Sequence, residues 1–257
     1  MSAAAILTKT LSDSRRGLIG WAVGTALVGM VYASTYPSQR ENVDSIPEAL
    51  RQSLNVDGTA AGYLQASVFG IIVPLLAMIY GVTMGARAIA GDEESGQLDL
   101  LLAHPITRTQ LALQRFGALV AGAFGISALV WLAVLAVRGS AELTSVSPLQ
   151  FLAQCFNLAL LAITFGALAV GVGAAVGRRA VVLVVVAVVG VLSYTASTFA
   201  TQIGADWIAH LSPFHYYIGG EPLRNGFQWG DAAVLVIASA IFVAAGLARF
   251  NRRDING

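Results

Sequence analysis

Hydrophobic residues occur along the chain in six long runs, separated by shorter polar segments. A helix that spans a membrane needs about 20 mostly apolar residues, and these runs predict spans over residues 17–36, 63–86, 116–137, 150–177, 180–202 and 232–248. The last run covers about 17 residues, at the short end of that range. Pro74 lies inside the second run, where its missing backbone N–H predicts a kink. The pattern therefore predicts an all-α membrane protein, with residues 1–257 forming a single transmembrane domain.

The polar segments predict short helices at the membrane surfaces. Residues 2–14 place Ile6, Leu7, Thr10 and Leu11 on one helical face, which indicates an N-terminal interfacial helix; a frayed terminus is the alternative. Residues 37–62 are polar and indicate a solvated connector with a short helix near residues 47–54. Residues 203–231 are rich in aromatic residues, glycine and proline. We expect one or two short re-entrant helices there, packed against the spans as an outer lid.

Composition indicates that lipid is the solvent for most of this chain. Of its 257 residues, 56% are hydrophobic and 11% are charged, whereas a soluble domain typically carries about 25% charged residues. The net charge of +1 gives no indication of a nucleic-acid partner. The single cysteine, Cys155, cannot form an internal disulfide and lies in an apolar run, so we interpret it as a packing residue.

The distribution of basic residues predicts the orientation of the spans. Of the fifteen Lys and Arg residues, only Arg40, Arg51, Arg138 and Arg224 fall on the side of the membrane opposite to the N-terminus. Cytoplasmic segments carry the excess of Lys and Arg, which predicts that both termini are cytoplasmic. Residues 17–36 are long for a signal peptide and lack a small-x-small cleavage site, so we expect a retained helix.

The most polar stretch of the chain, GDEESGQLDLLLAHPITRTQL, covers residues 91–111 and falls on the predicted cytoplasmic side. Within it, residues 97–103 can form about two helical turns, with Leu98, Leu101 and Leu102 on one stripe. Ser95 or Asp92 can cap the start of this helix, and Pro105 stops it. The stripe can either pack on the spans or fill a groove on a partner.

Motifs for catalysis, metal binding and nucleotide binding are absent from the sequence. A phosphate-binding P-loop requires GxxxxGK[ST], and the only lysine, Lys9, has no glycine before it. His210 and His215 are five residues apart but have no Cys or carboxylate motif that would complete a metal site. Ser193 lies in VLSYT, without the GxSxG elbow of a serine hydrolase. The sequence therefore predicts no catalytic residue, no metal site and no cofactor in this chain.

The predicted spans offer few other functional groups. An ion-coupled transporter usually keeps ionisable residues inside its spans, and these spans contain essentially none. Small residues recur four apart at Gly20 and Gly24, at Gly173 and Gly177, and at Ala121 and Gly125. Such pairs allow helices to approach closely. Because glycine and alanine are abundant here, such pairs also arise by chance, and we assign no subunit interface from them.

The acidic stretch resembles the loop after the second span in membrane subunits of type-2 ABC transporters. The resemblance is carried by EESGQLDLLLAHPITRTQL, with Glu93, Glu94, Gly96, the leucine-rich residues 98–102, Pro105 and Arg108. The segment LSPFHYYIGGEPLRNG is similar to the outer segment before the last span of that family, and ARFNRRDI is similar to its C-terminus. The resemblance extends over the whole chain.

The resemblance implies an ATP-driven exporter in a bacterial plasma membrane. Two permease subunits, identical or related, would form the pathway, and separate cytoplasmic ATPase subunits would supply ATP and Mg. A short coupling helix between spans two and three would dock on the ATPase. The implied coupling residues are Glu93, Glu94, Gly96, Leu98, Asp99, Leu101, Leu102, Pro105 and Arg108, with the leucines as apolar anchors and the charges setting register.

Cargo is indicated only by the character of the spans. Their polar groups are mainly Ser, Thr and Tyr, which suits a hydrophobic or amphipathic cargo such as a drug, lipid or natural product. Two alternatives remain open from the residues. One is an ion-coupled carrier or membrane-embedded enzyme that acts without an ATPase. The other is a structural scaffold that binds a partner and transports nothing.

Overall fold

The structure is a computed structural model that describes residues 15–45, 58–96, 107–200 and 204–252, and every regular element in those ranges is helical. Six of its helices are long and apolar enough to cross a membrane, as predicted. The predicted interfacial helix over residues 2–14 and the short helix near residues 47–54 lie outside the described residues.

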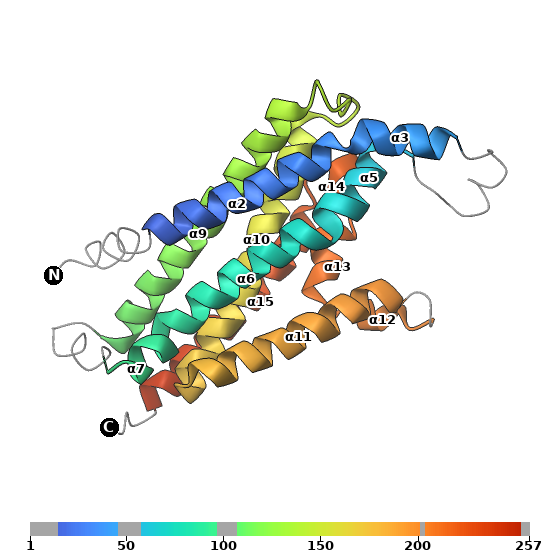
Figure 1. Ribbon diagram of the computed structural model, residues 1–257. Helices are drawn as coiled ribbons and strands as arrows, with labels where there is room; N and C mark the ends of the chain where they lie inside the picture. Colours follow the sequence, from blue (N-terminus) through green and yellow to red (C-terminus); the bar gives the residue numbers. More distant parts are fainter. Residues whose placement is uncertain (1–14, 46–57, 97–106, 201–203, 253–257) are drawn as a thin grey trace.

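The six spans follow one another along the chain, and short helices separate some of them (Figure 1). The first span is α2 (Arg15–Ser34), which is followed by α3 (Tyr36–Asp44). The second is continuous from α5 (Ala60–Ser67) through the π-helical turn η1 (Val68–Ile72), α6 (Val73–Ala86), a second π-helical turn η2 (Arg87–Gly91) and α7 (Asp92–Glu94). The remaining spans are α9 (Arg108–Val137), α10 (Pro148–Val176), α11 (Arg179–Phe199) and α15 (Trp229–Arg252).

Several predicted boundaries are corrected by the structure. Helix α15 has 24 residues rather than about 17, because the polar residues at both of its ends remain helical. Helix α9 begins eight residues before the predicted start at residue 116, after a capping box in which Thr107 and Gln110 exchange side-chain and backbone hydrogen bonds. The stretch predicted as a connector after the first span forms α3, which starts at Tyr36 with Pro37 in its first turn.

The described part of the segment between α11 and α15 contains three short helices, where one or two were predicted. They are α12 (Asp206–Ala209), α13 (Pro213–Ile218) and α14 (Pro222–Asn225). We refer to residues 204–228 as the insert. The end of the bundle that carries the insert is called the insert end. The opposite end, which carries Asp92, Arg108 and the turn between α10 and α11, is called the loop end (Figure 1).

Helix α10 is the centre of the bundle. Of the residues in its most apolar window, 72% are buried, against 22% for the first span and 17% for α11. Helices α6, α9, α11 and α15 all pack on it. Helices α2 and α9 lie together on one side, whereas α11 runs along the edge of the bundle (Figure 1). The outward surfaces of α2 and α11 are therefore the parts most open to lipid or to another subunit.

Glycines set the close packing around α10. A Cβ atom at Gly81 of α6 would overlap the Ala162 carbonyl oxygen, and one at Gly85 would lie 2.5 Å from the Gly166 carbonyl oxygen. On the other side, a Cβ at Gly246 of α15 would lie 2.5 Å from Cα of Gly171. Two helix backbones can approach this closely only where side chains are missing.

The small-residue pairs noted in the sequence serve other purposes. In the described ranges, Gly20, Gly24 and Gly125 have no atom near enough to contact a Cβ, so these positions make no close helix contact there. Gly173 packs near Ala90, and Gly177 ends α10 with a left-handed φ of 71°.

Candidate functional site

Acidic and basic side chains meet at the loop end. Asp92, in α7, lies with its Oδ2 2.5 Å from Nη2 of Arg115 on α9, and the two side chains are 12% and 20% exposed. Glu94 accepts a hydrogen bond of 2.8 Å at Oε1 from the backbone N–H of Arg179, the first residue of α11. A carboxylate at this position satisfies a helix-start N–H and favours the positive end of the helix. Two acids of the short helix α7 thus fasten the end of the second span to α9 and α11.

The start of α9 is fastened to the end of α15. Arg108 donates from Nη1 to the Phe250 carbonyl oxygen at 3.1 Å, and its guanidinium carbon lies 5.5 Å from the centre of the Phe250 ring. Asn251 donates from Nδ2 to Oγ1 of Thr109 at 3.1 Å. Phe250 is fully buried, so this contact combines a charged donor, a carbonyl and a buried aromatic face.

The structure describes four of the nine predicted coupling residues. Glu94 and Arg108 make the contacts within the chain given above, Glu93 places its carboxylate beside Gly177, and Gly96 adopts a left-handed φ of 69°. Leu98, Asp99, Leu101, Leu102 and Pro105 lie outside the described residues. A role for these nine residues toward an ATPase stays a prediction.

Sequence reasoning missed the basic partners of the acids. Arg115 and Arg179 were counted only as positive charges on one side of the membrane, and Asp92 only as a helix cap. The sequence does show that acidic and basic residues occur at the same end of different spans. It does not show which of them form pairs, because their proximity depends on how α9 and α11 pack around α10.

At the insert end, Tyr217 of α13 reaches into the second span at its π-helical turn. Within η1, the N–H of Val73 donates to the Val68 carbonyl, five residues back. The equivalent donor for the Phe69 carbonyl would be residue 74, and Pro74 has no N–H. The Tyr217 hydroxyl, which is 1% exposed, donates to the Phe69 oxygen at 3.0 Å. The predicted distortion at Pro74 is thus a π-helical turn whose open carbonyl is satisfied from the insert.

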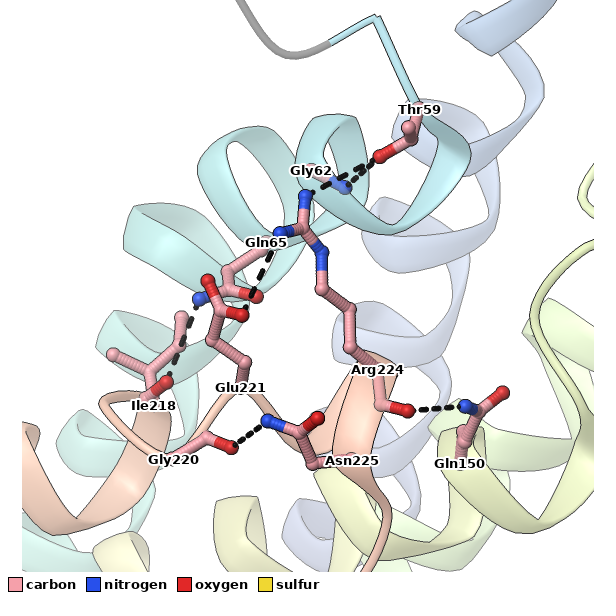
Figure 2. Close-up of polar contacts among 9 residues, drawn as sticks. All are labelled: Thr59, Gly62, Gln65, Gln150, Ile218, Gly220, Glu221, Arg224 and Asn225. Atoms are coloured by element: carbon pink, nitrogen blue, oxygen red, sulfur yellow. Dashed lines mark hydrogen bonds and ion pairs between the residues drawn. The ribbon is translucent and has the colours of Figure 1, made fainter.

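Further hydrogen bonds tie the insert to the second and fourth spans. Buried Asn157 of α10 donates from Nδ2 to the Tyr217 carbonyl at 3.2 Å. Gln65 of α5 donates to the Ile218 carbonyl at 3.4 Å, and Gln150 of α10 donates to the Arg224 carbonyl at 2.6 Å (Figure 2).

The Arg224 side chain adds a further contact between the insert and α5. Figure 2 shows it reaching Oγ1 of Thr59, the N-cap of α5, at 3.5 Å, with Oε2 of Glu221 also 3.5 Å from Nη1. The insert therefore bridges the ends of α5 and α10.

The two histidines of the insert form a stacked pair. The rings of His210 and His215 are 4.5 Å apart, and Nδ1 of His210 lies 3.0 Å from the Asp206 carbonyl oxygen. Burial, together with the positive charge that His210 can carry, lowers the pKa of His215, and the nearby Asp231 opposes that shift. Within the described ranges no three His, Cys, Asp or Glu side chains are grouped as a metal site would need.

The fold and its two polar ends define a multi-pass helical membrane protein, in which the second span connects the insert to the charged loop end. Comparison with family models then gives the family. Residues 10–251 match the model described as the multidrug efflux system permease Rv1217c, C-terminal domain. The chain belongs to this family of efflux permeases, which confirms the resemblance to the membrane subunit of an ABC exporter. Comparison with curated proteins gives no match.

Proposed function

We propose that this chain is the membrane subunit of an ATP-driven exporter, with its termini on the cytoplasmic side of a bacterial plasma membrane. Two such subunits form the translocation pathway, and separate ATPase subunits carrying ATP and Mg bind at the loop end. The observation that carries this proposal is membership of the efflux permease family across residues 10–251. The 257 residues contain no P-loop, which supports a separate ATPase subunit in this proposal.

The contacts at the loop end support coupling through residues 93–108. On one side of residues 97–106, Asp92 and Glu94 are bound to α9 and α11. On the other side, Arg108 is bound to the end of α15. A partner that moved this segment would therefore act on four spans, which are the second span, α9, α11 and α15. The leucine stripe at Leu98, Leu101 and Leu102 supplies the apolar surface that a docking helix needs.

The cargo we propose is hydrophobic or amphipathic. The family description names a multidrug efflux permease. The most exposed spans, the first one and α11, present outward surfaces rich in large apolar residues, among them Val184, Val191 and Leu192. Such surfaces suit contact with lipid, with a second subunit, or with an apolar cargo moving between them.

Copurification tests the coupling proposal directly. The chain is tagged and purified in mild detergent from cells of its native host, and its partners are identified by mass while ATP hydrolysis is measured. We expect a P-loop ATPase in stoichiometric amount. The Leu101→Asp/Leu102→Asp variant should lose it, since two carboxylates at an apolar contact would have to be desolvated.

The control is Leu149→Asp, because Leu149 is a leucine 61% exposed at the insert end. This variant should retain the ATPase. If the ATPase copurified equally with all three proteins, docking through the leucine stripe would be wrong. If wild type transported drugs in vesicles with no ATPase present, the ion-coupled alternative would replace the proposal.

A further inference from the structure

A polar cavity lies at the loop end between three spans. Its volume is about 270 Å³, and it is lined by Arg87 of η2, Arg115 of α9 and Arg179 of α11, together with Asp92, Met84 and Gly91. Each guanidinium group comes from a different span. A cavity of this size holds more than one water, which takes about 30 Å³ in the liquid.

The charges that line the cavity do not balance. Three arginines face one carboxylate, and that carboxylate, Asp92, lies against Arg115. Within the described part of the chain, the side chains of Arg87 and Arg179 have no acidic partner. The nearest other acids are engaged elsewhere: Glu94 accepts the backbone N–H of Arg179, and Glu93 lies beside Gly177. Among the residues that the structure describes, the lining of the cavity therefore carries an excess of positive charge.

One donor atom on each of two of these arginines also lacks a hydrogen-bond acceptor. The Nε atoms of Arg115 and Arg179 are buried, and no acceptor for them lies in the described residues. Buried donors are almost always paired, since leaving one without an acceptor costs free energy. Water could accept from them, but it would leave the positive charges uncompensated.

A tetrahedral oxyanion satisfies both requirements. Its several oxygens can accept from guanidinium groups that approach from three directions, and arginine forks bind phosphate with paired, charge-assisted hydrogen bonds. The cavity also lies where three spans end, and the ends of membrane-spanning helices are where lipid headgroups are expected. Basic pockets between transmembrane helices at this level bind anionic lipid headgroups.

We propose that Arg87, Arg115 and Arg179 form a binding site for a phosphate group that bridges the second span, α9 and α11. The group belongs either to the headgroup of an anionic lipid or to a phosphate in solution. The site does not depend on the proposed function, because the test below measures binding and stability in the purified chain without an ATPase or cargo.

The first measurement uses the wild-type full chain, stripped of lipid in detergent. Native mass spectrometry follows the binding of phosphatidylglycerol, phosphatidylcholine and inorganic phosphate, and thermal unfolding is recorded in parallel at matched ionic strength. We expect phosphatidylglycerol or phosphate, or both, to bind and to raise the unfolding midpoint relative to phosphatidylcholine or chloride. Binding by phosphatidylglycerol alone assigns a lipid source, and binding by phosphate alone assigns a soluble one.

The second measurement compares variants that lose the same charge. Arg87→Gln/Arg179→Gln removes two cavity arginines, whereas Arg178→Gln/Arg252→Gln removes two exposed arginines at the same end that do not line the cavity. We expect the cavity variant to bind the anion at least roughly tenfold more weakly, since two charged donors are lost, and the control to bind like wild type.

Two results would overturn the site. One is wild type that shows no preference for phosphatidylglycerol or phosphate over the neutral lipid or chloride. The other is equal weakening in the two variants, which would mean that general surface charge attracts the anion. The wild-type measurement stands even if the cavity variant does not fold.

Discussion

Replacing Tyr217 with phenylalanine tests the link between the insert and the second span. The change keeps the buried ring and removes only the hydroxyl that donates to the Phe69 carbonyl at 3.0 Å. That carbonyl then faces Pro74, which has no N–H to offer. A buried carbonyl left without a donor costs about 1–3 kcal/mol, whereas hydrogen bonds between membrane helices average about 0.6 kcal/mol. We therefore expect Tyr217→Phe to lower the free energy of unfolding by about 1–2 kcal/mol.

A double-mutant cycle with Pro74→Ala tests whether this cost comes from the unpaired Phe69 carbonyl. Alanine restores an N–H at residue 74, which can donate to the Phe69 carbonyl across the same π-helical turn. This N–H then replaces the Tyr217 hydroxyl as the donor to the Phe69 carbonyl. Tyr217→Phe should cost less in the Pro74→Ala background than in wild type, by about 1 kcal/mol on the scale of one such hydrogen bond.

The assay is equilibrium unfolding in mixed micelles of mild detergent and dodecyl sulfate, with hydrogen exchange followed over residues 213–225. Tyr216→Phe is the matched control, because the Tyr216 hydroxyl donates at 2.9 Å to the His210 carbonyl in an exposed setting. We expect faster exchange in the insert for Tyr217→Phe only. Equal costs for the two phenylalanine variants, or a cost that Pro74→Ala leaves unchanged, would refute the reasoning.

Two further substitutions examine the packing around α10 and the loop end. Gly81→Ala should lower the free energy of unfolding by about 1–3 kcal/mol, because the added methyl group overlaps a backbone oxygen of α10. Gly125→Ala, in open space, should be neutral or stabilise by up to about 1 kcal/mol; equal thermal shifts for the two would argue against close packing at Gly81. Asp92→Asn should cost about 1–3 kcal/mol by leaving Arg115 without its anionic partner. A double-mutant cycle with Arg115→Gln checks this, and strictly additive costs would mean that the pair contributes nothing.

The six spans could be predicted because their apolar runs are long and almost free of charge. Their ends could not, because a helix continues into polar sequence wherever caps and neighbours satisfy its backbone. Thr107 and Gln110 start α9 well before the apolar run begins. Polar residues at both ends of α15 are likewise helical, so the hydropathy pattern underestimated the length of this helix by seven residues.

The packing glycines illustrate a second limit of sequence reasoning. Gly81 and Gly85 are spaced like Gly20 and Gly24. The first pair lies against α10, whereas a Cβ at either glycine of the second pair would contact no atom of the described residues. The spacing shows that a helix has a face of small residues. It does not show whether that face packs against a neighbouring helix, because this depends on the rotation of the whole helix in the bundle.

The charged residues of the loop end show the same dependence on tertiary contacts. Glu94 and Arg108 were predicted from the family resemblance to face a partner, and in the structure each bonds to the backbone of another span. A docking segment needs both kinds of contact. Glu94 and Arg108 hold the residues on either side of it to the bundle, and the leucines between them are the residues we propose to meet the ATPase.

The second span is the element that connects both ends of the molecule. At the insert end its Phe69 carbonyl holds Tyr217, in the middle Gly81 and Gly85 press it against α10, and at the loop end Asp92 binds Arg115. A π-helical turn stands on each side of α6. Such a turn holds one residue more than an α-helical turn, so it changes which side chains face the bundle. Because α6 is confined by backbone contact with α10, we expect a shift imposed at Asp92 to move the whole span and so to reach Phe69 and the insert.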